Sequence, residues 1–249
     1  MSYLRTLPGL LLAAVLAAPL VVQGEEPPAV TADLIYTSRY VHRGIERAGP
    51  SAQAGVEWTN ERLRGGGWIN QPFASGAVRE SNLNAAYTWP SDRGFTLEAS
   101  VVHRWFHGVP GGQVKRSFEA GLSATLPAFQ GFTLGLAYNH DFRLHADTTQ
   151  VSLARSIPLT RLGAFLELEG LAGWSTGDDW RPDAIGPRRH DSYSYWSGSA
   201  RLPYRIGLHS TVIAGLHYAD ASGRSATNGP FGLTARRNLW VTLGVNLDF

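Results

Sequence analysis

The chain has no cysteine, a single lysine (Lys115) and, after its first residues, no long hydrophobic run. Without cysteine there is no disulfide framework, no thiolate metal site and no lipid-anchored N-terminal cysteine. After residue 24 no apolar stretch approaches the roughly 18 residues that a membrane-spanning helix requires, which excludes a helical membrane protein. The formal net charge is +2, and a nearly neutral chain gives no electrostatic reason to expect nucleic acid as a partner.

Residues 1–24 have the pattern of a secretory signal peptide. Arg5 supplies a positive charge, residues 7–22 are mostly apolar, and Gly24 ends the segment with a small residue. We expect cleavage before Glu25. The sequence therefore predicts an exported protein with a signal peptide at 1–24 and a single domain at 25–249.

The last stretch, residues 238–249, alternates strictly between apolar and polar positions. Its apolar face carries Leu239, Val241, Leu243, Val245, Leu247 and Phe249. Such a strand is about as long as a tilted strand needs to be to cross a bilayer. The sequence also ends on an aromatic residue, as do the closing strands of bacterial outer-membrane barrels, where this residue belongs to the assembly signal. An edge strand of a soluble sandwich is the alternative.

Similar strands follow one another along the rest of the chain, with no helical stretch between them. The pattern predicts an all-β fold, a 12-stranded antiparallel up-and-down transmembrane β-barrel, since single-chain bacterial barrels have an even number of strands. The strands are expected at residues 30–43, 51–59, 67–73, 82–89, 95–105, 117–125, 132–140, 148–157, 162–174, 191–202, 208–218 and 238–249.

Connections alternate in length along the chain. Short turns are expected at 90–94, 127–131, 158–161 and 203–207, each opening on a proline that ends the strand because it lacks an N–H donor. Longer connections, such as 106–116, 175–190 and 219–237, lie between them. Short turns on one rim and long loops on the other are typical of outer-membrane barrels, with both termini in the periplasm.

Alternation alone does not say which face points outward, and a soluble barrel would turn its apolar face inward. Bulky charges on the polar face and aromatic residues at the strand ends favour apolar faces directed to the lipid. A periplasmic aromatic girdle is then expected from Trp58, Trp89, Phe95, Phe132 and Phe249. An outer girdle is expected from Tyr40, Tyr138, Trp174 and Tyr218.

With this orientation the charged side chains face the lumen. The predicted pore-lining residues are Arg39, Arg43, Gln53, Glu57, Glu98, Arg104, Glu119, Glu167, Glu169 and Arg201. Arginines gather toward the outer end and glutamates lie at mid-height or below, which predicts a constriction that modestly favours cations. Alternatively, the charges pair across neighbouring strands and merely fill the lumen, as Arg104 and Glu119 are placed to do. Arg155, on the apolar face, is expected to reach the headgroups.

An enzyme is the competing class. A lipid hydrolase needs a serine and a histidine at one depth on one face. His209 and Ser210 are consecutive and point to opposite sides, while His140 and Ser152 are possible partners across two strands. A protease-like or Ca²⁺-binding group could form from Asp178, Asp179, Asp183, His190 and Asp191 in the loop at 175–190, which also carries arginines. Neither pattern is specific, so no catalytic residue, cofactor or metal is predicted.

One segment resembles a known family. Ser38-Arg39-Tyr40-Val41-His42-Arg43-Gly44-Ile45, followed by Pro50-Ser51-Ala52-Gln53-Ala54-Gly55, is similar to the opening of the TorF-type (Gcw_chp) family of proposed outer-membrane porins. The matching positions are Tyr40, Arg43, Gly44, Pro50, Gln53 and Gly55. The chain departs from the pattern at Ala54 and at Gly67-Trp68-Ile69-Asn70. The resemblance covers about 35 residues and implies an outer-membrane pore in which Arg43 and Gln53 tie the first hairpin.

These observations predict a porin in the Gram-negative outer membrane that passes small solutes by passive diffusion through a narrow charged lumen. Its expected partners are outer-membrane lipid, small solutes and, through the C-terminal strand, the barrel assembly machinery. A closed barrel acting as a surface adhesin or scaffold is the first alternative, and a lipid-active enzyme is the second.

Overall fold

The computed structural model describes residues 29–91, 94–109, 114–178, 190–223 and 237–249. The predicted signal peptide at 1–24 and the residues leading from it to the first strand lie outside these ranges. No helix among the described residues is long and apolar enough to span a membrane.

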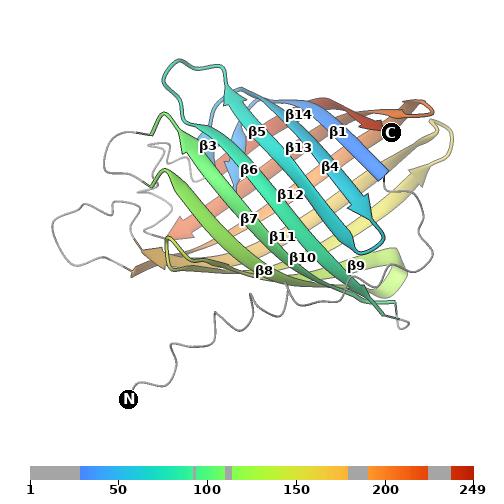
Figure 1. Ribbon diagram of the computed structural model, residues 1–249. Helices are drawn as coiled ribbons and strands as arrows, with labels where there is room; N and C mark the ends of the chain where they lie inside the picture. The colour runs from blue at the N-terminus through green and yellow to red at the C-terminus, as the bar shows by residue number, and fades with distance from the viewer. Residues whose placement is uncertain (1–28, 92–93, 110–113, 179–189, 224–236) are drawn as a thin grey trace.

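Within the described residues, twelve strands close into one antiparallel barrel (Figure 1). Each barrel strand pairs with the next along the chain, and the last pairs with the first. The predicted 12-stranded up-and-down barrel is confirmed. Its strands are β1 (Ala29–Thr37), β4 (Ser51–Asn60), β5 (Leu63–Pro72), β6 (Arg79–Pro90), β7 (Thr96–His107), β8 (Arg116–Pro127), β9 (Phe132–Asp141), β10 (Ala146–Leu159), β11 (Ala164–Asp178), β12 (His190–Gly207), β13 (Ser210–Gly223) and β14 (Arg237–Asp248).

The apolar faces of the strands point outward. On β14, Leu239 and Leu243 are 61% and 57% exposed, whereas Asn238 on the opposite face is completely buried. Leu34, Val56, Leu83 and the other large apolar residues of the walls are exposed in the same way. An exterior of this kind is stable against lipid rather than water, as the alternating sequence predicts.

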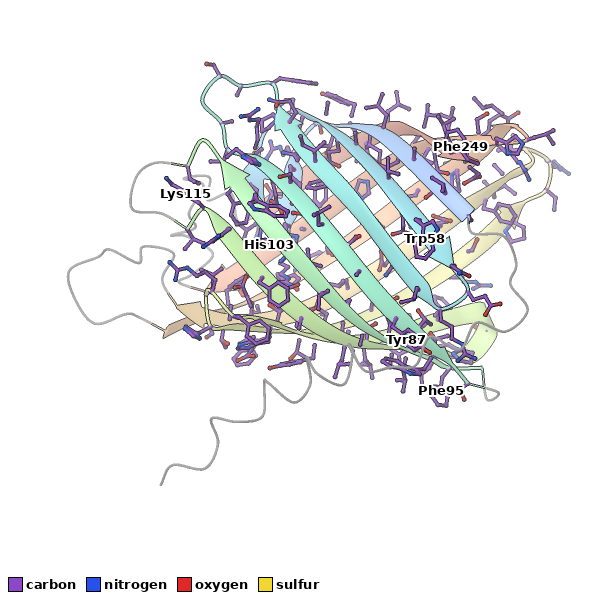
Figure 2. The ribbon with its side chains drawn as sticks, viewed as in Figure 1. Trp58, Tyr87, Phe95, His103, Lys115 and Phe249 are labelled. Atoms are coloured by element: carbon purple, nitrogen blue, oxygen red, sulfur yellow. The ribbon has the colours of Figure 1, made fainter. Side chains whose placement is uncertain are left out.

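The two rims differ in most of their connections. Two to five residues connect the strands at the rim where β1 begins and β14 ends, whereas residues 38–50, 73–78 and 108–115 connect them at the other rim. The long connection expected at 141–147 is wrong, because only residues 142–145 join β9 to β10. A single 3₁₀ turn, η1 (Phe129–Gly131), joins β8 to β9. Trp58, Tyr87, Phe95 and Phe249 lie toward the short-turn rim in Figure 2, while Lys115 lies at the opposite end.

Most strand boundaries differ from the prediction by one to five residues, and three of these differences have a clear physical reason. β5 begins at Leu63 rather than at residue 67, because the glycines at 65–67 pair closely with β4; a Cβ at Gly66 would lie 2.6 Å from the Val56 carbonyl oxygen. β10 and β12 continue through Pro158 and Pro203, which pair with β11 and β13. The turns follow at 160–163 and 208–209 because each proline removes only one donor from an otherwise continuous ladder.

The largest difference concerns the first predicted strand, expected at 30–43. β1 ends at Thr37, and the chain then forms a separate hairpin of β2 (Tyr40–His42) and β3 (Ile45–Ala48) (Figure 1). Arg43 and Gly44 form the turn with φ of 52° and 77°. Positive φ at both central residues is the type I′ geometry that suits a two-residue hairpin. We call residues 39–48 the lumen hairpin, because its side chains contact the inner faces of the barrel strands.

Candidate functional site

The ladder determines which residues share the inner face, because directly paired residues lie on the same side of a sheet. Eight of the ten predicted pore-lining residues lie on the inner wall of the barrel. These are Gln53, Glu57, Glu98, Arg104, Glu119, Glu167, Glu169 and Arg201. Arg39 and Arg43, expected on the first strand, lie instead in the lumen hairpin. The role of all ten residues in lining a pore stays a prediction.

The tip of the lumen hairpin is bound to β8. The Arg43 guanidinium lies 2.8 Å from the Glu119 carboxylate, and Arg104 on β7 lies 3.2 Å from the other oxygen of the same carboxylate. The predicted pairing of Arg104 with Glu119 is therefore present. The predicted tie between Arg43 and Gln53 is wrong, because Gln53 donates to Asn70 Oδ1 at 3.1 Å.

The strands of the hairpin are bound to β6. Arg47 Nη1 donates to Glu80 at 2.8 Å, and the Tyr40 hydroxyl donates to the same carboxylate at 3.0 Å. Burial, and then the charge of Glu80, raises the pKa of Tyr40 above its usual value. Burial opposes the charged form of Arg47, but the charge and hydrogen bond of Glu80 prevail and raise the pKa of this guanidinium. Tyr40 also packs on Trp68, so its expected place in the outer girdle is wrong.

The other side of the hairpin meets the opposite wall. Gly44 lies against Tyr195 on β12 and Ala221 on β13, where a Cβ would come within 2.6 Å of the Tyr195 Cβ. Asn238 Nδ2 on β14 donates to the Gly44 carbonyl oxygen at 3.4 Å. The turn thus needs glycine both for its φ and for this close approach. Since the same turn reaches Glu119 on β8, the hairpin crosses the lumen from wall to wall.

Exposure separates the lumen into two sections. Around the hairpin the ion-paired side chains of the barrel wall are nearly sealed: those of Glu80, Arg104 and Glu119 are 3%, 9% and 6% exposed, while Arg39 at the start of the hairpin is 42% exposed. Toward the short-turn rim the inward charges are open to solvent, with Arg64 41% and Arg201 48% exposed. We call the first section the plug and the second the vestibule.

The plug and the vestibule carry different charge. In the plug, Arg39, Arg43, Arg47 and Arg104 face Glu46, Glu80 and Glu119. The inward charges of the vestibule are set by the strand registers. Among the described residues they are Asp33, Glu57, Glu98, Glu167, Glu169, Asp248, Arg64, Arg201 and Arg205. Arg64 pairs with Glu57 and Glu98 at 3.5 and 2.9 Å, and Arg201 pairs with Glu167 at 3.1 Å. The vestibule therefore carries a net negative charge. The sequence predicts glutamates at mid-height of the lumen and below.

His42 in the hairpin has a buried ring nitrogen, Nε2, that makes no hydrogen bond with the described residues. It is the one hairpin residue of this kind within the described part of the chain. Burial, and then the charges of Arg47, Arg43 and Arg104, hold the pKa of His42 well below its usual value. The neutral ring is thus part of the packed state of the plug.

The candidate pair of His140 and Ser152 is not assembled. His140 points outward and lies 2.9 Å from Asp147, whereas Ser152 pairs with Gly135 on the inner face. Asp179 and Asp183 lie outside the described residues. No three histidine or carboxylate side chains lie close enough to hold a metal ion in the part of the chain that the structure describes. Arg155, on the outer face, lies over the ring of Phe132.

A closed twelve-stranded barrel with an apolar exterior and a charged interior has the architecture of bacterial outer-membrane proteins. The chain is similar in structure to the KdgM porin, with a TM-score of 0.57 and 9% identity over 88% of this chain and 99% of that one. It is also similar to the COG4313 outer membrane channel from Pseudomonas putida F1, with a TM-score of 0.56 and 10% identity over 93% and 99%. The chain is also similar to LpxR from Salmonella typhimurium, with a TM-score of 0.53 and 6% identity over 87% of this chain and 99% of that one.

Identities this low establish the shared fold alone. LpxR, unlike the other two proteins, is not named as a porin or a channel, so the fold by itself does not choose between a pore and another activity. No protein-family model and no curated protein sequence matches this chain.

Proposed function

We propose that this protein is a narrow channel of the Gram-negative outer membrane, through which small solutes diffuse passively and whose constriction is the lumen hairpin. The observation that carries the proposal is the solvent-open, charged vestibule inside a barrel with an apolar exterior. A barrel whose only task was to present loops would have no need of unfilled, charged space within its wall.

Orientation and assembly belong to the same proposal. The signal peptide at 1–24 would direct export, the short-turn rim and both termini would face the periplasm, and the plug would face outward. Phe249 is 73% exposed at the short-turn rim, and its N–H donates to the Val30 carbonyl oxygen at 2.9 Å, which extends the closing ladder. These features support contact with lipid and with the barrel assembly machinery through β14. The TorF-type resemblance of residues 38–55 supports the same localisation.

The acidic vestibule sets the expected selectivity. Six carboxylates face three guanidiniums there, so cations and cationic solutes should be enriched over anions. The constriction limits the size of these solutes, since the hairpin occupies the cross-section at the plug. No catalytic role is proposed for any residue.

A closed barrel that acts through its loops is the second candidate, and the plug favours it. The contacts of the hairpin with β6, β8, β12 and β14 leave the side chains of Arg43, Glu46 and Arg47 only 11–15% exposed. If the hairpin never leaves this position, the lumen conducts little.

Planar-bilayer recording of purified, refolded protein decides between the two. The test compares the wild type with a variant in which residues 40–48 are replaced by Gly-Gly-Ser, each first shown to be folded by heat-modifiable migration on SDS gels. A channel gives a small wild-type conductance and a several-fold larger one in the variant. Absence of ion current in both folded proteins would sink the channel proposal, whereas current in the variant alone would favour the closed barrel.

A further inference from the structure

The vestibule contains a cavity of about 170 Å³ between strands β11 and β14. Four of its residues, Glu169, Ser199, His217 and Trp240, form a single row across the four strands, because each is paired directly with the next. Ser197 and Arg201 flank this row by one step of the inner face on either side. The cavity is therefore built from one level of the barrel wall.

One wall of the cavity is flat and apolar. The rings of His217 and Trp240 stack with centroids 5.1 Å apart and planes 14° from parallel. A hydrogen bond of 2.9 Å between His217 Nε2 and Thr242 Oγ1 holds the imidazole in place. Gly215 leaves the space that this bond needs, since a Cβ there would lie 2.4 Å from Thr242 Oγ1. The aromatic wall is thus held rigidly before any ligand enters.

The opposite side of the cavity presents charge. Arg201 is neutralised by Glu167 at 3.1 Å, but the Glu169 carboxylate forms no ion pair or side-chain hydrogen bond within the described residues. The two serine hydroxyls can each donate or accept a further hydrogen bond. With the neighbouring pair neutral, the cavity keeps one net negative charge beside a flat apolar surface.

We propose that this cavity binds a small organic cation, a primary ammonium carried on a flat body, with the ammonium on Glu169 and the body against Trp240. A dry cavity of about 150 Å³ holds a benzene-sized molecule, so the available space fits one ring with a short ammonium arm. The assignment deepens the proposed channel by naming a solute class, but binding itself does not require conduction.

Isothermal titration calorimetry of the full refolded barrel in detergent tests the assignment, with benzylammonium as the probe. Three control compounds each change one feature: methylammonium lacks the flat body, benzyl alcohol lacks the charge, and benzoate carries a negative charge. Each should bind at least about tenfold more weakly than benzylammonium, because it loses either the charge-assisted hydrogen bond or the stacked ring. Glu169→Gln should weaken benzylammonium binding about tenfold or more. Glu61→Gln, which removes a carboxylate from the exposed β4–β5 turn, should leave binding unchanged.

Equal binding of benzyl alcohol and benzylammonium, or an unaffected Glu169→Gln variant, would overturn the proposal. If Glu169→Gln fails to fold, Trp240→Leu provides the second test, and its binding of benzylammonium should be weakened while that of methylammonium stays unchanged. Binding without ion current would support the cavity and refute the channel. Ion current without binding would support the channel and refute the cavity.

Discussion

Replacing Glu119 by Gln should release the lumen hairpin from the wall of the barrel. Glu119 is 4% exposed and receives both Arg43, from the hairpin, and Arg104, from β7. Removing one partner of a buried ion pair costs about 3–5 kcal/mol, because a charge is left buried without compensation. Part of this cost falls on Arg104, so we take about 3 kcal/mol as the loss in docking of the hairpin. Since each 1.4 kcal/mol is a factor of ten, the undocked population should rise about a hundredfold.

The chain has no cysteine, which makes this population measurable by thiol labelling. Ala48 on β3 is 1% exposed, so a cysteine introduced by Ala48→Cys should react with a membrane-impermeant maleimide only when the hairpin leaves the plug. While the undocked state is rare, the labelling rate follows its population. Adding Glu119→Gln to this background should therefore accelerate labelling about a hundredfold.

Glu57→Gln is the matched control. This glutamate also pairs with an arginine, Arg64 on the adjacent strand β5, but its side chain is 36% exposed, and pairs at that exposure contribute about 0–1 kcal/mol. Labelling should change by less than about fivefold. An unchanged labelling rate in the Glu119→Gln background, or an equal increase with Glu57→Gln, would refute the hairpin as a docked plug.

Other parts of the barrel give three further predictions. The pKa of His42 is lowered while the hairpin is docked, so the undocked hairpin binds a proton more readily. Docking should therefore be strongest above about pH 6.5, the usual pKa of histidine, and should weaken as the pH falls below this value. His42→Gln should abolish this dependence of thiol labelling on pH. Replacing Glu167 and Glu169 by Gln should reduce cation preference, and an unchanged reversal potential would contradict the acidic vestibule. Phe249→Ala should keep the closing ladder but lower the heat-modifiable fraction recovered from membranes, whereas an equal yield would remove this residue from assembly.

The walls of the barrel could be predicted from the sequence because they depend on a local property. Alternation in β14 places Leu239 and Leu243 outside and Asn238 inside whatever the rest of the chain does. The same rule assigned the inner face of Glu57, Glu167 and the other wall residues. Ladder ends were less predictable, since Pro158 and Pro203 interrupt one hydrogen bond without ending the strand.

The lumen hairpin could not be predicted in the same way. The sequence does indicate a turn at Arg43-Gly44, but the alternation before it continues that of β1. Its inward direction depends on partners far along the chain, Glu119 for Arg43 and Tyr195 for Gly44. Such contacts exist only once the barrel is closed, and no local pattern encodes them.

The ladder between β1 and β14 covers residues 31–37, while that between β12 and β13 covers residues 193–207. The shorter seam is extended by two hydrogen bonds of 3.0 Å between Ser38 and Val241, and it is reinforced from inside by Asn238, which donates to the Gly44 carbonyl oxygen. The segment that narrows the lumen thus also fastens the first strand to the last. A mutation that undocks the hairpin to widen the lumen should therefore also weaken the pairing of β1 with β14. A wider lumen would come at the cost of a less stable barrel.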